Sequence, residues 1–128
     1  MSRYLLASSA DAAETDRAAL ADLCAGLRGD GHEVFWLAPR EHRALVLEAG
    51  AVHCSPLVAG TTVPDRALGR RARAVVDLQR HVAQVQPDAL VTSPDCDDAA
   101  DFVTRQVPLR WLRAADAASA YGTAGARS

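Results

Sequence analysis

The sequence predicts an α/β fold, a three-layer Rossmann-like domain around a mostly parallel sheet of five strands in the order 3-2-1-4-5. Short apolar runs alternate with helical patterns, which is typical of parallel strands joined by right-handed crossovers. The runs are apolar through their length, as in strands covered on both faces of the sheet. The length of 128 residues fits a single domain.

Each strand or helix is predicted from its pattern of apolar residues and from the glycine, proline or polar residue that ends it. The strands are predicted at residues 4–8, 33–38, 52–54, 89–92 and 109–112. The helices are predicted at residues 12–28, 41–49, 65–86 and 97–106. Glycines end the first two helices and Pro87 ends the third. Asp11, with Glu14 three residues on, forms a capping-box pattern before the first helix.

The longest predicted helix, at residues 65–86, has an apolar and a charged side. The predicted core side consists of Leu68, Ala72, Val75, Val76, Gln79 and Val82. The predicted solvent side consists of Arg66, Arg70, Arg73, Asp77 and Arg80. We expect His42 and His81 to lie on helix surfaces, and His32 to serve as a turn residue at a helix end. His53 and Cys54 are expected to pack in the core.

Composition excludes several classes of partner. The formal net charge is −2, and the basic residues are all Arg and scattered, so we expect no nucleic-acid partner. No apolar run approaches the roughly 18 residues of a membrane span, and acidic residues follow the first apolar run, so we expect neither membrane insertion nor a signal peptide. The three cysteines form no CxxC unit, which predicts reduced thiols in the cytoplasm and no metal site.

The fold itself predicts where a ligand binds. In such sheets, ligands lie beyond the carboxyl ends of the strands where the strand order reverses, here between the first and fourth strands. We therefore predict that Ser8, Ser9, Asp11, Ser93 and Asp95 bind substrate. The first loop lacks the glycines that wrap a phosphate, and the dinucleotide fingerprint is absent, so we expect no cofactor.

The acidic run that starts at Asp95 has two readings. It could hold Mg²⁺ or sugar hydroxyls at the edge of the sheet. Alternatively, its carboxylates cap free N–H groups at a helix start and oppose the helix dipole, which is the reading we favour. Cys96 lies within this run, and the neighbouring carboxylates would raise the pKa of its thiol, which argues against a nucleophile.

Four segments, in this order, resemble the N-terminal domain of GT-B-fold glycosyltransferases. They are Tyr-Leu-Leu-Ala-Ser at 4–8, Leu-Arg-Gly-Asp-Gly-His-Glu-Val-Phe-Trp-Leu at 27–37, Glu-Ala-Gly-Ala at 48–51 and Pro-Asp-Ala-Leu-Val-Thr-Ser-Pro at 87–94. The resemblance spans residues 3–113, and its nearest type is the antibiotic and macrolide UDP-glycosyltransferases of actinomycetes. Its most specific piece is the segment 31–34.

The resemblance implies an acceptor-side half of a glycosyltransferase. In the family, a second domain binds the nucleotide-sugar, and a His near the start of the first helix acts as general base. Here no His occurs between Met1 and Gly31, and the matching position falls near Asp16, so Asp16 replaces the base or the base is lost. We expect a truncated domain at residues 1–113 with an Ala/Gly-rich tail at 114–128. It would bind a small-molecule acceptor and would not be active alone.

The expected partner is a separate donor-domain chain or a second copy of this chain. Two alternatives stay open. The chain is a non-catalytic small-molecule-binding or accessory protein of natural-product biosynthesis, derived from a glycosyltransferase, or it is a remnant that folds and binds nothing. Turnover of a nucleotide-sugar after mixing with a second chain separates the first reading from both others.

Overall fold

The computed structural model describes residues 2–55 and 66–117, with the side chains of residues 66–73 and 117 left undescribed. The strands are β1 (Arg3–Ala7), β2 (Glu33–Leu37), β3 (Val52–Cys54), β4 (Ala89–Thr92) and β5 (Arg110–Arg113). The helices are α1 (Glu14–Gly29), α2 (Arg43–Ala49), α3 (Arg66–Val85), α4 (Asp97–Thr104) and α5 (Ala114–Ala117), with short 3₁₀ turns η1 (Arg40–His42) and η2 (Pro94–Cys96). The predicted elements are confirmed, with shifts of one or two residues at most ends.

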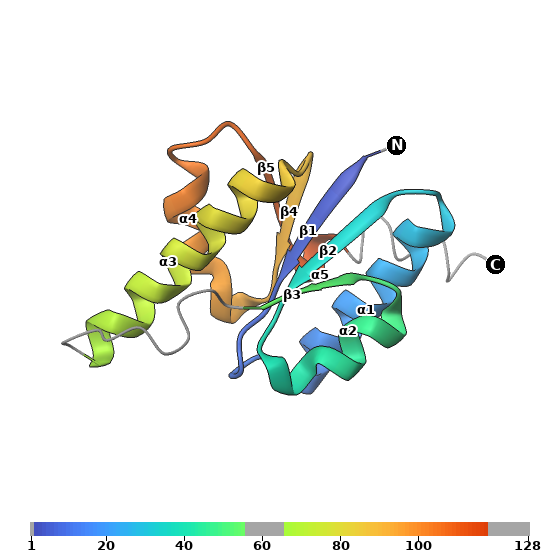
Figure 1. The fold of residues 1–128 in the computed structure, drawn as a ribbon, viewed down its shortest axis with the longest axis horizontal. Helices are drawn as coiled ribbons and strands as arrows, with labels where there is room; N and C mark the ends of the chain where they lie inside the picture. Colours follow the sequence, from blue (N-terminus) through green and yellow to red (C-terminus); the bar gives the residue numbers. More distant parts are fainter. Residues whose placement is uncertain (1, 56–65, 118–128) are drawn as a thin grey trace.

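The strands form one sheet in the order β3-β2-β1-β4-β5, and every pair is parallel. This confirms the predicted fold class. In the register, Leu5 of β1 lies beside Phe35 of β2 on one side and Leu90 of β4 on the other. Helices α3 and α4 cover one face, whereas α1 and α2 cover the other, giving three layers (Figure 1).

Alternation along the central strands divides the core between the two faces. Leu6 packs with Trp36 and residues of α1, and Leu5 packs with Leu90 and residues of α3 and α4. All four of these side chains are fully buried. The strands are continuous apolar runs because successive side chains point to opposite faces of the sheet and both faces are buried.

The turn between α1 and β2 confirms the predicted helix stop. Gly31 has φ of +87°, a conformation that glycine adopts without a steric penalty. The backbone N–H of His32 then donates to the Leu27 carbonyl at 3.0 Å, so His32 is the turn residue expected. The predicted capping box is wrong: α1 begins at Glu14 after Ala13, which caps it without a side-chain hydrogen bond, and Asp11 lies in the preceding turn.

Helix α3 matches the predicted orientation only in part: Val82 is buried and Val75 packs against the core as expected, but the buried side extends to residues predicted at the surface. The described core positions on it are Leu78, His81, Val82 and Val85, all buried. Asp77, expected in solvent, is only 7 % exposed, and His81 only 4 %. Val and Ala occur on both sides of this helix, so a shift of the core stripe by one position, about 100° around the axis, leaves the apolar pattern nearly unchanged.

Two other expectations concern the surface and the chain end. His42 is half-buried rather than exposed, and its Nδ1 is buried with no hydrogen-bond partner among the described residues. Ala114 of α5 is buried in the core layer that contains α1. The rest of the predicted tail, from residue 118, lies outside the described residues. In the described ranges, no helix is long and apolar enough to cross a bilayer.

Truncating the core on β4 tests this packing. We expect Leu90→Ala to lower the free energy of unfolding by about 2–5 kcal/mol, because Leu90 is fully buried and leaves a cavity. The same substitution at Leu47, which is 51 % exposed, should cost about 1 kcal/mol or less. Urea unfolding followed by circular dichroism measures both. Equal losses would contradict the burial described here.

Candidate functional site

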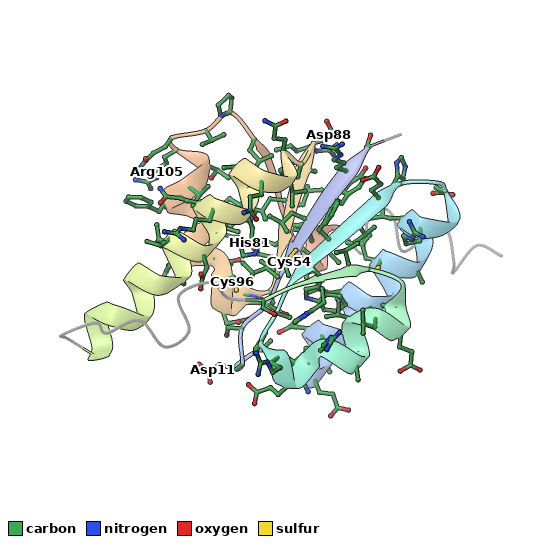
Figure 2. The ribbon with its side chains drawn as sticks, in the orientation of Figure 1. Asp11, Cys54, His81, Asp88, Cys96 and Arg105 are labelled. Atoms are coloured by element: carbon green, nitrogen blue, oxygen red, sulfur yellow. The ribbon has the colours of Figure 1, made fainter. Side chains whose placement is uncertain are left out.

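The carboxyl ends of β1 and β4 lie side by side, as the predicted site requires. Beyond the strands, the N–H of Ser93 donates to the Ala7 carbonyl at 3.1 Å, and that of Ser8 donates to the Leu37 carbonyl at 3.0 Å. The loops after β1, β2 and β4 therefore start from fixed positions. Figure 2 shows Asp11 at this end of the sheet and Asp88 at the opposite end.

Asp95 links the loops that follow β4 and β1. Its Oδ2 accepts the backbone N–H of Ser9 at 2.8 Å, and its Oδ1 accepts the Ser93 hydroxyl. It does not cap α4 through its side chain, so the capping interpretation is wrong for this residue: the cap of α4 is Cys96, without a side-chain hydrogen bond. Partial burial alone raises the pKa of Asp95, but the hydrogen bonds from Ser9 and Ser93 outweigh it and lower the pKa below its ordinary value of 3.8.

The serines predicted to bind substrate are engaged with the protein. The buried Ser8 Oγ accepts the indole N–H of Trp36 at 2.9 Å. Ser93 is completely buried, while Ser9 is half-exposed. Ser8 and Ser9 line a cavity, described next. Ser93 and Asp95 do not line it, but their hydrogen bonds hold the adjacent loops together.

A cavity of about 190 Å³ lies between the carboxyl ends of β1 and β2, helix α3 and the η2–α4 segment. We refer to it as the switch cavity. Its described lining residues are Ala7, Ser8, Ser9, Ala10, Leu37, Ala38, Pro39, Ala74, Asp77, Leu78, Cys96 and Ala99. Apart from the two serines, Asp77 and Cys96, this lining is apolar, and Asp77 is the one charged group in it.

Asp77 is the site residue that the sequence reasoning missed. It was placed on the solvent side of α3, whereas the structure buries it against the switch cavity. Its direct neighbours Val76 and Leu78 gave no signal of this, because successive residues of a helix point to different sides. His81 reinforces this turn, because its Nδ1–H donates to the Asp77 carbonyl at 2.8 Å.

The predicted general base lies elsewhere. Asp16 is in the first turn of α1, half-exposed, and is not among the residues that line the switch cavity. Asp11 does not line it either; it is exposed, and its N–H donates to Ser9 Oγ at 3.1 Å. Roles for Asp11 and Asp16 in substrate binding or catalysis remain predictions.

Cys96 is not an activated nucleophile. Burial, followed by the negative charge of Asp95, raises the pKa of its thiol to about 12, so the thiol is protonated at neutral pH. Burial similarly raises the pKa of Cys24 to about 11. Within the described ranges, no three His, Cys, Asp or Glu side chains are grouped so that they could share a metal ion.

Asp97, a second carboxylate of the acidic run, connects β4 to β5. Asp97 Oδ1 accepts the hydroxyl of Thr92 at 3.1 Å, and its Oδ2 lies 3.2 Å from Arg113 Nε. Thr92 in turn accepts the indole N–H of Trp111 at 3.0 Å, and the Arg113 guanidinium lies over the Trp111 ring. Asp97 is therefore a structural residue between β4 and β5.

Three solved glycosyltransferase structures share this arrangement of strands and helices. The glycosyltransferase of kitacinnamycin matches with a TM-score of 0.65 and 15% identity over 88% of this chain and 30% of its own. MurG of Acinetobacter baumannii gives a TM-score of 0.70 and 14% identity over 88% and 34%. A glycosyltransferase of Streptomyces sp. SF2575 has a TM-score of 0.62 and 18% identity, and the match covers 88% of this chain and 39% of that one. The chain has the fold of a GT-B glycosyltransferase domain. No protein-family model and no curated protein matches the sequence.

The GT-B-like domain spans about a third of the length of the enzymes it matches. At these levels of identity the likeness concerns the fold. Within that fold, the switch cavity lies at the carboxyl ends of β1 and β2 and is bordered by the η2–α4 segment that follows β4. It is thus next to the point between β1 and β4 where doubly wound domains bind their ligands.

Replacing Asp95 tests its role as a link between loops. Above pH 4, we expect Asp95→Asn to lower the free energy of unfolding by roughly 1 kcal/mol, since the bonds from Ser9 and Ser93 lose a charged acceptor at an exposed site. Because the folded-state pKa is lowered, this stabilisation is fully present above the unfolded pKa and is lost as the pH falls through the folded value.

The measurement is urea unfolding of wild type and Asp95→Asn at several pH values from 7 to 2.5. The difference between the two proteins should be constant above about pH 5 and should shrink at the lowest pH values. Asp11→Asn is the control, because the Asp11 carboxylate accepts no hydrogen bond from a described residue. A difference independent of pH would refute the charged link.

Proposed function

We propose that this domain binds the acceptor of a glycosyl transfer and acts together with a separate donor-domain chain. The single observation that carries the proposal is the switch cavity, an apolar pocket with one buried carboxylate at the carboxyl edge of a GT-B-like domain. The activity of the whole enzymes with this fold is extended here to a chain that covers about a third of them.

The size and lining of the switch cavity define the acceptor class. An engineered apolar cavity of about 150 Å³ binds benzene. A cavity of about 190 Å³ therefore takes one substituted ring of a larger molecule. The apolar walls favour a carbocyclic or aromatic ring, and Asp77 favours a hydroxyl on that ring. Such groups occur in the natural products glycosylated in actinomycetes, and we assign the acceptor to this class.

The proposed chemistry needs a proton acceptor at the hydroxyl. As the hydroxyl oxygen bonds to the anomeric carbon of the sugar, the bond from that carbon to the nucleoside diphosphate breaks and the diphosphate leaves with the electron pair. The hydroxyl proton must pass to a base within hydrogen-bond reach. Asp77 lines the cavity and fulfils the requirement of position. Asp16 is the base expected from the family pattern. It could reach the hydroxyl only of a ligand that extends out of the cavity to α1. Asp77 and Asp16 are thus two alternative bases for the same reaction, and their substitution should have different effects on transfer.

The donor has no place in the described part of the cavity. A nucleotide-sugar carries a diphosphate, which proteins hold with cations or with N–H groups of glycine-rich loops. The described lining contains no Arg or His. This supports a donor site on a partner, either a donor-domain chain or a second copy. Since all three cysteines are free, we place the reaction in a reducing compartment such as the cytoplasm.

A second candidate function is acceptor binding without turnover, in an accessory protein of natural-product biosynthesis. The absence of any His before Gly31 favours it, because the family base is then missing. This candidate requires the same cavity but no donor partner.

Binding of ring compounds tests the cavity itself. We expect phenol to bind weakly, with Kd of about 1 mM, and Ala74→Trp to weaken it at least about tenfold by filling the cavity. Ala83→Trp places the same side chain on an exposed position of α3 outside the cavity, and should leave binding unchanged. Ligand-observed NMR measures the affinities. Equal binding by both tryptophan variants would exclude the cavity.

Asp77→Asn should weaken phenol about fivefold and toluene hardly at all, because only phenol has a hydroxyl to donate. For turnover, each variant is mixed with a nucleotide-sugar and a donor-domain chain from a neighbouring gene. Loss of transfer in Asp77→Asn but not in Asp16→Ala assigns the proton to Asp77, and the reverse assigns it to Asp16. Phenol binding without transfer by any such pair favours the accessory protein.

A further inference from the structure

We propose that a second cleft, at the β3 edge of the sheet, binds a phosphate monoester that carries an apolar substituent. This edge cleft has a volume of about 710 Å³ and is formed by η1, α2, β3 and the residue after β3. The residues that matter for binding are Arg40, Arg43, Leu47, Val52, His53 and Ser55. The inference does not depend on the proposed glycosyl transfer.

Two cations share the edge cleft without a counter-charge. Arg40 and Arg43 lie three positions apart in the continuous turn from η1 into α2. Neither guanidinium forms an ion pair with a described residue, and the described lining contains no carboxylate. Three other described arginines form ion pairs. These pairs are Arg3–Glu33, Arg105–Asp101 and Arg113–Asp97.

The pair of guanidinium groups selects the charge of the ligand. Each presents a planar fork of N–H donors that matches the oxygens of a phosphate or a carboxylate. One carboxylate carries a single negative charge, whereas a phosphate monoester approaches two at neutral pH and offers three terminal oxygens. Two unpaired arginines in one cleft are therefore balanced better by the phosphate.

Ser55 supplies a neutral donor to the same anion. The Nε2–H of His53 donates to the Ala38 carbonyl at 2.9 Å, so the neutral ring presents Nδ1 as an acceptor. Ser55 Oγ lies 3.5 Å from that Nδ1, at the long limit of a hydrogen bond. A phosphate oxygen in the cleft is a stronger, charged acceptor, and the Ser55 hydroxyl can turn to it at little cost.

Apolar side chains line the cleft beside the arginines. Leu47 is 51 % exposed and Val52 is 54 % exposed. They are two of the four large hydrophobic side chains that stand exposed in the described part of the chain, and the other two, Phe102 and Val107, lie outside this cleft. Exposed apolar surface next to paired cations fits a ligand with an apolar body and an anionic end.

Phenyl phosphate is the probe, measured by calorimetry at low salt. We expect it to bind about tenfold more tightly than inorganic phosphate, because the ring covers Leu47 and Val52, and benzyl alcohol not to bind in this cleft. The double variant Arg40→Gln/Arg43→Gln should weaken phenyl phosphate at least about tenfold. The control, Arg105→Gln/Arg110→Gln, makes the same change of charge elsewhere and should alter affinity less than about twofold.

A second pair of variants separates the apolar and anionic contributions. Leu47→Ala/Val52→Ala should weaken phenyl phosphate about threefold or more and leave inorganic phosphate unchanged. Ala74→Trp, which fills the switch cavity, should leave phenyl phosphate binding intact. The proposal fails if both arginine double variants weaken binding equally, if phenyl phosphate does not bind, or if Ala74→Trp alone abolishes binding. Loss of binding in Ala74→Trp would place the ring of phenyl phosphate in the switch cavity, and it would not contradict the proposal that this cavity binds the acceptor.

Discussion

The parallel pairing of β1 with β2 on one side and β4 on the other is the constraint on which the domain depends. It brings residues that are far apart in sequence to one edge, as in the bonds from Ser93 to Ala7 and from Ser9 to Asp95. The switch cavity lies between the loops that follow β1 and β2, whose first residues are held by these bonds, and helix α3. Without the flanking strands, neither the position of Ser8 nor the wall formed by Leu37 would be defined.

The two proposed sites differ in polarity. The switch cavity is nearly apolar and holds one carboxylate, whereas the edge cleft holds two arginines and two exposed apolar side chains. They lie on either side of the short segment that follows β2, in which Pro39 lines the cavity and Arg40 lines the cleft. A domain with this division can select a neutral ring at one place and an anion at another.

The strands, the helix order and the sheet topology could be predicted because each rests on local signals: continuous apolar runs, glycine stops and proline breaks. The meeting of Ser9 and Asp95 followed from topology alone. The orientation of α3 was predicted only in part, since Ala and Val populate several sides of the helix and one of its charged residues, Asp77, is on the buried side. The link that Asp95 forms was also missed, because one of its hydrogen-bond partners, Ser9, lies 86 positions away, although the other, Ser93, is only two positions away.

The central place of β1 has a consequence for how the chain reaches its native state. One of its partners, β4, is separated from it by more than eighty residues, as the spacing of 86 between Ser9 and Asp95 illustrates. Contacts of such long sequence separation close late and slow the folding reaction. During synthesis on the ribosome, the edge of β1 that pairs with β4 has no partner until β4 emerges. In that interval the unpaired backbone groups along this edge of β1 are open to pairing with other chains.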